Sequence, residues 1–500
     1  MSTAPAASLP SPLLIRNMAR AEAPQSPPPS AMAGANARAL AGRPGGNEAT
    51  APLMARTSTS SSSRAVRQVK TVPVFLLVNP KSGGHRGSKL MRVPQPFDVE
   101  VSASCTASLR IYDMLEGPSG EKPGFVQLKE ATRLGPVRMV VAGGDGTVLW
   151  ALEEAEKHGV DTRHQVMLAV LPLGTGNDFS RFAGWGGKAP KMRNLTKGTL
   201  SGLRELVLEW VRAKANAHDI WRVAMEVDAH RGVILKTSHE RKKVPINEKR
   251  IEKLMHSYFS AGNDARAGMG QEKVRTSTRW GNFLNYGYQI CLKGLPFREK
   301  EYVKDFLYAL RHGQSDESPV IFSTDDDEDV HEPRLVDNPQ VLIILNIPNC
   351  YGGLCRFWEG AGSVGVHPVA DANILHAELD PADGKLEVLT YGSLLMEPML
   401  NVTTQAGLPA HRFNAKRIFS GAPLFLQLVE DDEEDVVVHV QVDGEFFKLK
   451  NPSSVSFDLH RQIKVLYGGK PTDADAGSDN AEEAESSSSE SDEEGIGVQQ

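Results

Sequence analysis

The sequence predicts an α/β domain with a mostly parallel sheet, followed by a mainly antiparallel β-sandwich domain, with disordered segments at both ends. The chain has 500 residues, which is more than one hydrophobic core usually supports, so two folded domains are expected. Short, continuous apolar runs dominate the first half, and a helical pattern separates two of them. From about residue 219 onwards, alternating apolar and polar residues between turns indicate an antiparallel arrangement.

The first domain is predicted from three strands that read as buried on both faces. They are Val72 to Val78, Val137 to Ala142 and Val166 to Leu171. A helix is expected from Val148 to His158, which makes a parallel crossover between the second and third strands. A longer amphipathic helix is expected over about residues 195–214, with its apolar stripe against the sheet.

The second domain is predicted from strands that turns or acidic segments separate. The expected strands are Ile220 to Val227, Phe283 to Leu292, Val341 to Ile347, Lys385 to Tyr391, Pro423 to Leu428, Val436 to Val442 and Val455 to Asp458. One helix, Glu299 to Leu310, is expected to interrupt them, and Glu430 to Asp435 is expected to be a solvated loop. Asp325 to Asp329 has the spacing of a calcium loop, but Val330 and Val336 stand where such a loop needs Gly and Glu.

Charge and composition divide the chain further. Residues 1–70 carry a net charge of +6 and residues 471–500 one of −10, whereas residues 71–470 are nearly balanced at −2. This balance argues against nucleic acid as a partner of the folded part. We therefore expect a disordered leader over 1–70, an α/β nucleotide-binding domain over 71–218, a β-sandwich over 219–470 and a disordered acidic tail over 471–500.

The cysteines and the apolar runs restrict where the protein works. Four cysteines in so long a chain indicate a reducing compartment, and the spacing of Cys350 and Cys355 favours thiols over a zinc site. The longest apolar run, around Val341 to Ile347, has the length of a strand, so a membrane substrate would be reached from outside the bilayer.

Glycine-rich segments follow each of the three buried strands. The first, Asn79-Pro80-Lys81-Ser82-Gly83-Gly84, offers backbone N–H groups that a phosphate can approach, although it is not a Walker A loop. The second, Gly143-Gly144-Asp145-Gly146-Thr147, leads into a helix that Thr147 can cap, and the Asp145 carboxylate can hold Mg²⁺ or take a proton. The third, Gly174-Thr175-Gly176-Asn177-Asp178, carries side chains that can bind phosphate, ribose or metal-bound water.

Together these segments resemble the catalytic domain of the diacylglycerol kinase family, which is related to sphingosine, ceramide and bacterial lipid kinases. Arg181 and Trp185-Gly186 extend the third segment as that family does. The second half carries segments similar to those of the accessory domain, namely Tyr258 to Ala265, Asn346-Ile347-Pro348 with Gly352-Gly353, and Gln441 to Glu445. The resemblance covers about residues 73–467 and rests on six motifs in the expected order.

The resemblance implies a kinase that binds ATP and Mg²⁺ between its two halves. It implies an ATP site lined by Asn79, Ser82, Gly83, Gly84, Gly143, Gly144, Asp145, Gly146, Thr147, Gly174, Thr175, Gly176, Asn177 and Asp178. By the same resemblance Asp443 is the expected catalytic base, and Glu445 and Asp145 are expected to hold the metal. Asp145 is also the rival for the base, because sphingoid relatives give that role to the aspartate of this motif. From the residues alone, Asp443-Gly444 can also be a hairpin turn.

The expected activity is transfer of the γ-phosphate of ATP to the hydroxyl of diacylglycerol, giving phosphatidic acid. A sphingosine or ceramide kinase and, less favoured, a non-catalytic signalling scaffold are the alternatives. The chain has too few cysteines for the lipid-binding module of many animal relatives, so recruitment to the membrane must come from another part of the protein. We expect a cytoplasmic protein in peripheral contact with the membrane. The basic stretch Lys236 to Lys253 is a candidate for that contact, and a solvated loop is an equal alternative.

Overall fold

The computed structural model describes residues 70–237, 243–272, 300–324, 332–353, 356–369, 371–392 and 415–469. The predicted leader, the acidic tail, the acidic segment at 325–329 and the predicted strand Phe283 to Leu292 lie outside these ranges. So do Cys291 and Cys355, while Cys105 and Cys350 are free thiols. Within the described ranges, no helix is long and apolar enough to cross a bilayer.

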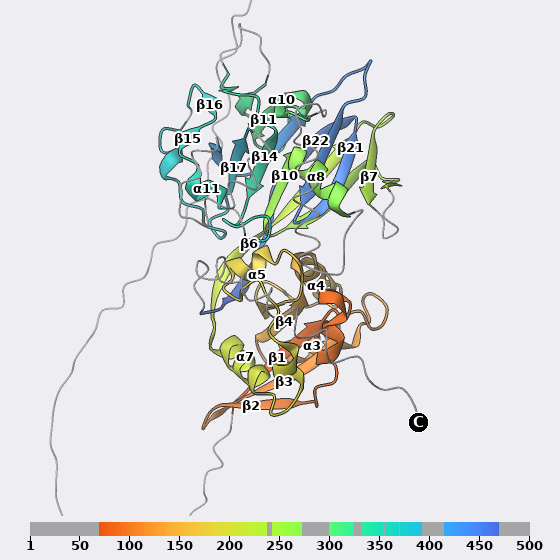
Figure 1. Ribbon diagram of the computed structural model, residues 1–500, viewed down its shortest axis with the longest axis vertical. Helices are drawn as coiled ribbons and strands as arrows, with labels where there is room; N and C mark the ends of the chain where they lie inside the picture. The colour runs from red at the N-terminus through yellow and green to blue at the C-terminus, as the bar shows by residue number, and fades with distance from the viewer. Residues whose placement is uncertain are drawn as a thin grey trace, which may run out of the picture. The chain divides into compact units, whose positions relative to one another are not determined.

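The first half is an α/β unit, as predicted (Figure 1). Strands β3, β1, β4 and β5 are parallel neighbours, and β2 pairs antiparallel with β3. The strands are β1 Lys70–Val78, β2 Phe97–Ser102, β3 Cys105–Asp113, β4 Val137–Gly143 and β5 Val166–Pro172. The helices are α1 Ser82–His85, α2 Gly87–Leu90, α3 Pro123–Thr132, α4 Asp145–Lys157, α5 Asp178–Phe182, α6 Met192–Thr196 and α7 Ser201–Arg212.

Helices cover both faces of this sheet, which explains the continuous apolar runs. Phe75 and Leu77 of β1 share a core with α3 and α4, whereas Val74, Leu76 and Val78 share one with α6 and α7. The amphipathic segment at 195–214 was predicted as one helix, but it forms two. Gly198 and Leu200 have positive φ angles of 65° and 54°, so the backbone turns between α6 and α7. The predicted stripe is nevertheless buried, with Leu203, Val207 and Trp210 in the core.

The second half is a sandwich of two mainly antiparallel sheets, which confirms the predicted fold class. One sheet has the order β15-β18-β17-β14-β10-β20-β21-β7-β8, and the other continues the sheet of the first half through β22, β19, β11, β12, β13 and β16. Successive side chains of β10 and β14 belong to two different cores, one on each face of their sheet. Phe259 and Ile344 lie in the core inside the sandwich, and Tyr258 and Ile343 lie in a second core on the opposite face.

The elements of this half are bounded as follows. The strands are β6 Lys214–Val227, β7 Val233–Thr237, β8 Lys243–Ile246, β9 Arg250–Met255, β10 Tyr258–Gly262, β11 Leu307–His312, β12 Val320–Ser323, β13 Arg334–Leu335, β14 Val341–Leu345, β15 Ser363–Val364, β16 Val366–His367, β17 Leu386–Tyr391, β18 Lys416–Gly421, β19 Leu424–Leu428, β20 Val437–Val442, β21 Glu445–Lys450 and β22 Pro452–Tyr467. The helices are α8 Asn263–Glu272, α10 Val303–Phe306, α11 Phe357–Gly360 and the 3₁₀ turn η1 Ile374–His376.

The predicted helix from Glu299 to Leu310 is wrong over its second part. Only Val303–Phe306 is helical, and Leu307–His312 forms β11. This strand pairs with both β12 and β19, so sheet formation overrides the helical pattern. The acidic segment Glu430 to Asp435 is exposed, as expected of a solvated loop.

Strands β6 and β22 connect the two halves. They pair antiparallel from Lys214↔Tyr467 to Val227↔Pro452, and the last part of β22 also pairs in parallel with β5, as Lys464↔Met167 and Val465↔Leu168. The predicted boundary between residues 218 and 219 therefore falls inside a strand. This two-stranded connection brings the end of β22, at Tyr467, back to the sheet that carries the glycine segments.

Candidate active site

The three glycine segments meet at the carboxyl ends of β1, β4 and β5. Two backbone hydrogen bonds tie the strand ends together: the N–H of Asn79 donates to Ala142 O over 3.1 Å, and that of Leu173 donates to Gly143 O over 2.9 Å. The crevice at the carboxyl edge of a parallel sheet is where α/β proteins bind ligands. The predicted clustering of these segments is therefore present.

The turn after β1 has an unusual left-handed course. Gly83, Gly84 and His85 have φ angles of 61°, 64° and 67° in succession. Asn79 shapes the turn, because its side-chain Oδ1 accepts the N–H of Lys81 and its carbonyl oxygen accepts that of Ser82. Successive left-handed residues turn backbone N–H groups toward one side, which suits an anion.

The turn after β4 lies against the turn after β5. A Cβ atom added to Gly174 would lie 2.6 Å from Gly144 Cα, and one added to Gly143 would lie 2.5 Å from Thr147 Cβ. The expectation that Thr147 caps the helix is wrong. Gly144 is the N-cap, and Thr147 is the third residue of α4, packed against Gly143. Gly174 is thus required by close packing between the two turns, and Gly143 by packing against Thr147 within its own turn.

Asp145, the first residue of α4, supports the neighbouring helix. Its carboxylate accepts the N–H groups of Asp178 and Phe179 at the start of α5, over 3.1 and 3.2 Å. Burial raises the pKa of Asp145, the Asp443 carboxylate raises it further, and His256 opposes the shift. Asp145 remains partly exposed, so it can still meet a ligand.

Asn177 and Asp178 hold loops in place. Asn177 has a φ of 57°, and its Nδ2 donates to Gly174 O and Gly187 O over 2.9 and 2.8 Å. The Asp178 carboxylate accepts the N–H groups of Gly352 and Gly353, in the second half, over 2.9 and 2.6 Å. Burial and the nearby Asp145 raise the pKa of Asp178 to about 7.

Asp443 occupies a hairpin turn and is also a site residue. Its φ is 47° and that of Gly444 is 79°, which is the geometry of the tight turn that joins β20 to β21. The Asp443 carboxylate reaches back to accept three backbone N–H groups, those of His256, Ser257 and Tyr258, over 2.8, 3.0 and 2.9 Å. Only 3% of its side chain is exposed.

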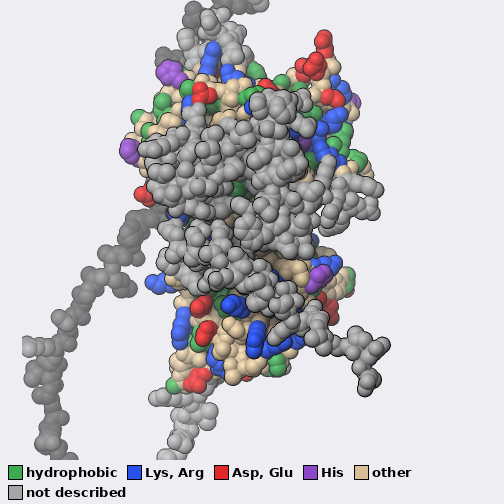
Figure 2. Space-filling model, in the orientation of Figure 1, with side chains coloured by type: hydrophobic (Ala, Val, Ile, Leu, Met, Phe, Trp, Pro, Cys, Tyr) green, Lys and Arg blue, Asp and Glu red, His purple; other side chains and the backbone are tan. Residues whose placement is uncertain are grey.

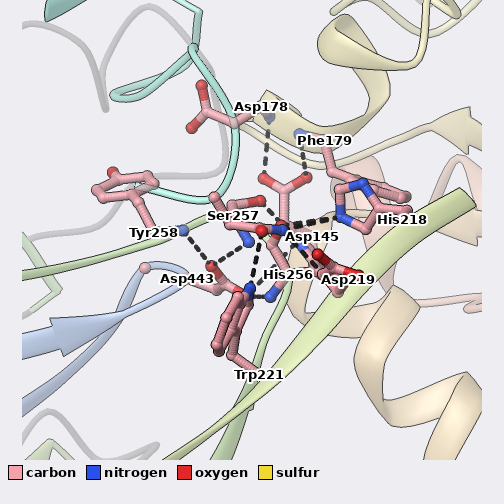
Figure 3. A network of polar contacts seen from close by, with 12 residues as sticks. Asp145, Asp178, Phe179, His218, Asp219, Trp221, His256, Ser257, Tyr258 and Asp443 are labelled. Carbon is pink, nitrogen blue, oxygen red and sulfur yellow. Dashed lines mark hydrogen bonds and ion pairs between the residues drawn. The ribbon is translucent and has the colours of Figure 1, made fainter. Parts of the chain in front are cut away.

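A buried polar network joins Asp145 and Asp443 (Figure 3). The His256 ring lies against that of Phe179, with 4.5 Å between centroids, and places Nε2 3.3 Å from Asp145 O and Nδ1 3.5 Å from Asp443 Oδ2. The His256 carbonyl oxygen accepts the Asn346 amide over 2.7 Å and contacts the ring of His218 at 3.0 Å. Burial lowers the pKa of His218 to about 3, so this imidazole is neutral at pH 7.

His218 and His256 were not among the predicted site residues. Neither belongs to a glycine segment, and a single histidine on an apolar strand carries no signal of its own in the sequence. Asn346, in contrast, was part of the predicted Asn346-Ile347-Pro348 segment. Its side chain accepts the Trp221 N–H and donates to Asp219 O, which explains why an amide stands there.

Glu445 lies on β21, two residues after Asp443, with separate partners. Its carboxylate binds the ammonium groups of Lys253 and Lys236. Among the residues that the structure describes, no three or more His, Cys, Asp or Glu side chains are grouped so that they could hold a metal ion. Kinases hold Mg²⁺ with one or two carboxylates plus substrate phosphates, and Asp145 and Glu445 remain the carboxylates predicted for that role.

Comparisons with known proteins agree with the motifs. Residues 73–204 match the family model described as "Diacylglycerol kinase catalytic domain", and residues 254–446 match the "Diacylglycerol kinase accessory domain". The chain is 25% identical over 412 residues to the eye-specific diacylglycerol kinase of Drosophila melanogaster, covering 79% of this chain and 23% of that protein. It is 30% identical over 259 residues to diacylglycerol kinase 7 of Arabidopsis thaliana, covering 44% and 49%.

A solved structure is similar as well. It is a diacylglycerol kinase from Bacillus anthracis, with 14% identity and a TM-score of 0.36, covering 80% of this chain and 97% of that one. The chain spans less than half of the length of the two curated relatives.

Proposed function

Because this chain belongs to the diacylglycerol kinase family, we propose that it transfers the γ-phosphate of ATP to the hydroxyl of diacylglycerol, giving phosphatidic acid. The observation that carries the proposal is the pairing of two halves at one site. The glycine turns and Asp145 come from the region that matches the catalytic model, and Asp443 comes from the region that matches the accessory model.

The glycine turns would bind the triphosphate. Gly83, Gly84 and Gly144 present backbone toward the crevice without side chains, and α4 begins directly after Gly144. A helix N-terminus and left-handed turns both favour anionic groups. Bound Mg²⁺ would neutralise charge on the phosphates, with Asp145 and Glu445 as its protein ligands.

Asp443 is the proposed base for the lipid hydroxyl. A carboxylate has about four acceptor positions. Three backbone N–H groups occupy three of them, two on Oδ1 and one on Oδ2, so Oδ2 keeps one position for a proton. The three donors fix the orientation of the carboxylate before the substrate arrives, which lowers the cost of reaching the reactive geometry.

Asp145 is the competing candidate for the base. Its raised pKa is the property that favours proton uptake. It already accepts two N–H groups from α5, so it also has acceptor positions left. Steady-state kinetics of Asp443→Asn and Asp145→Asn would distinguish the catalytic base from the metal ligand.

The lipid substrate is tested directly on the purified full chain. The protein is incubated with radiolabelled ATP, Mg²⁺ and mixed micelles of diacylglycerol, sphingosine or ceramide, and the labelled lipid is measured. We expect labelled phosphatidic acid as the main product. Labelling of sphingosine or ceramide alone would favour the sphingoid alternative, and absence of labelling in every arm would favour a non-catalytic scaffold.

Peripheral, salt-sensitive membrane contact in the cytoplasm is part of the same proposal. Several cations of the basic stretch are matched by acids: Arg250 contacts Glu226 and Glu252, and Lys236 and Lys253 contact Glu445. Arg241 and Lys242 lie outside the described residues, and Lys243 and Lys249 are exposed. Each Lys or Arg near an anionic surface is worth about 1 kcal/mol, and salt screens that attraction.

Vesicle co-sedimentation tests this contact. Neutralising Lys243 and Lys249 should reduce binding to anionic vesicles by about 30-fold at low salt, since two lysines contribute about 2 kcal/mol. Neutralising Lys191 and Lys197, which are exposed in the first half, is the matched control and should have little effect. Equal sedimentation of the two variants would show that the stretch is only a solvated surface.

A further inference from the structure

A basic surface lies beside the glycine turns of the first half. Residues 79–97 carry four Lys or Arg and no Asp or Glu, and residues 179–204 carry six Lys or Arg and no Asp or Glu. Seven of these ten side chains are exposed and have no hydrogen bond, ion pair or ring contact within the part of the chain that the structure describes. The basic surface consists of these seven residues, Lys81, Arg86, Lys89, Arg92, Lys191, Arg193 and Lys197.

The two segments that carry the basic surface pack against each other. Leu90 of α2 and Leu195 of α6 belong to one core, so these two helices are neighbours. Lys81 directly precedes α1, which contains the left-handed turn of Gly83 and Gly84. The cations therefore stand beside the turn that is proposed to bind phosphate, and Figure 2 shows Lys and Arg side chains at the surface of this half.

The charge of the basic surface is not balanced by the acids that flank it. Asp98, Asp178 and Glu205 border the two segments in sequence, and none of them forms an ion pair with the seven cations within the described ranges. Cations of the second half differ in this respect, as the pair of Lys450 and Asp435 at 2.9 Å shows. The basic surface therefore offers a positive field to an acidic partner.

The acidic tail leaves the folded chain next to this surface. Residues 471–500 hold ten Asp or Glu and no Lys or Arg. Just before the tail, the N–H of Gly468 donates to Ala183 O over 2.8 Å, and a Cβ added to Gly468 would lie 2.2 Å from Gly184 O. Ala183 and Gly184 belong to the second basic segment, residues 179–204. The tail therefore begins against the segment that carries Lys191.

The direction of β22 and the length of the tail bring the two charged parts within reach. Strand β22 runs parallel to β5, with Val465 opposite Leu168, so it points to the sheet edge that carries the turn after β5. Thirty extended residues span up to about 100 Å, which is enough to reach every residue of the basic surface. A segment tethered by a short linker has an effective concentration in the millimolar range, which favours it over an untethered acidic partner.

We propose that the acidic tail, residues 471–500, docks on the basic surface and shields it from phosphate-bearing ligands. The docking does not depend on the proposed function, whereas competition with nucleotide rests on it. Single exposed ion pairs contribute little, so the contact depends on the summed charge of the two parts and not on one particular pair. The order of the residues within the tail should therefore matter less than their charge.

Zero-length carbodiimide cross-linking of the full chain tests the docking. The reagent joins a carboxylate to a lysine amine that contacts it, and mass spectrometry identifies the joined residues. We expect links from the acids of residues 473–494 to lysines of the basic surface at low salt. These links should fall about tenfold or more at 1 M salt, where the Debye length is about 3 Å.

The cross-linking is carried out on an equal mixture of ¹⁴N-labelled and ¹⁵N-labelled chains, which separates links within one chain from links between chains. Links from the tail to Lys243 or Lys249 in place of the basic surface, links only between chains, or no links from the tail would each overturn the proposal.

Calorimetric binding of inorganic triphosphate to the full chain tests the shielding. A variant with the ten tail acids replaced by Asn or Gln should bind triphosphate about tenfold more tightly than wild type at low salt, and the difference should vanish at 1 M salt. A variant with the same tail residues in a different order is the matched control and should bind as wild type does. Equal affinity of the neutralised and wild-type chains at low salt would overturn the shielding. Absence of triphosphate binding with either tail would contradict the proposed function, and cross-linking would still decide the docking.

Vesicles distinguish the tail from an anionic membrane as the occupant of the basic surface. The double variant Lys191→Gln, Lys197→Gln should reduce the links from the tail to Lys81 and Lys89 several-fold and leave sedimentation with anionic vesicles unchanged. The double variant Lys243→Gln, Lys249→Gln is the matched control and should leave these links unchanged. Loss of sedimentation without loss of links in the first variant would assign the surface to the membrane and overturn the proposal. Thermal unfolding of each variant checks that the fold is retained.

Discussion

Asp145 and Asp443 each stand beside a glycine at the end of a β-strand, and the chain uses the two turns differently. The turn of Asp145 leads into α4, and its carboxylate accepts two N–H groups at the start of α5. The turn of Asp443 joins β20 to β21, and its carboxylate accepts three N–H groups from the segment before β10. Both residues are half-buried, and the side chain of Asp443 is only 3% exposed.

The difference separates two ways of preparing a carboxylate for chemistry. Asp443 is fixed in one orientation by its donors, with little freedom to follow a moving ligand. Asp145 has two donors instead of three, and burial raises its pKa. Four predictions test this comparison.

The largest effect is expected from the glycines that let the turns of Asp145 and Asp178 touch. Gly144→Asp would place a side chain and a negative charge in the proposed phosphate path, and a Cβ at this position lies only 3.1 Å from Gly174 Cα. Activity should fall by at least ~10³-fold. Gly146→Ala is the matched control for folding, because an added Cβ meets nothing within 4 Å there. Measurable turnover by Gly144→Asp close to that of wild type would contradict the nucleotide assignment.

The next effect distinguishes the two carboxylates in catalysis. If Asp443 is the base, Asp443→Asn should lower kcat about 10²-fold or more with a modest change in KM for ATP. Asp145→Asn should mainly raise KM for MgATP, because it removes a metal ligand. Steady-state kinetics at several Mg²⁺ concentrations measures both. The reverse pattern would assign the base to Asp145.

Replacing Asp443 should lower the free energy of unfolding more than replacing Asp145, because Asp443 accepts three N–H groups and Asp145 accepts two. Asp443→Ala leaves three backbone N–H groups without their acceptor, and each buried loss costs about 1–3 kcal/mol, so the free energy of unfolding should fall by several kcal/mol. Asp145→Ala leaves only two N–H groups without their acceptor, those of Asp178 and Phe179 at the buried start of α5, and should cost less than Asp443→Ala. Denaturant unfolding of both variants makes the comparison, and equal losses would mean that the donors do not set the difference.

The smallest effect concerns pH. Asp178 has a pKa of about 7 in the folded chain against 3.8 as the ordinary value, so the folded state holds an extra proton between these two pH values. Its contribution to stability is therefore fully present below about pH 4 and is lost as the pH rises to about 7. The free-energy difference between wild type and Asp178→Asn should shrink across that range. Asp98→Asn, on the exposed face of β2, is measured in parallel as the control for an exposed aspartate.

Much of this fold was predictable because the apolar pattern of each strand is visible in that strand's own residues. The runs at Val72 to Val78 and Val137 to Ala142 are buried on both faces, and such strands read as continuous apolar segments. The break between α6 and α7 was missed because Leu200 carries no sequence signal for its left-handed backbone. Likewise, residues 307–310 look helical alone, and only the partners β12 and β19 make them part of a strand.

The candidate site was predictable in its loops and not in its supporting contacts. The glycine segments meet because each follows a parallel strand. The anchoring of Asp443 was not foreseeable, since its donors at His256 to Tyr258 are separated from it by more than 180 residues in sequence. The pairing of Lys236 and Lys253 on Glu445 likewise depends on the register of β7 and β21, which the residues alone do not specify.

The return of β22 to β5 has a consequence for synthesis on the ribosome. Until residues 463–467 emerge, the edge of β5 that β22 will occupy lacks its final partner, although every other strand of that parallel sheet has already been made. An unpaired strand edge invites association with other chains, and contacts so distant in sequence form slowly. The α/β half therefore waits for β22 before its sheet is complete, and chaperone dependence during translation should be concentrated in the interval before β22 is made.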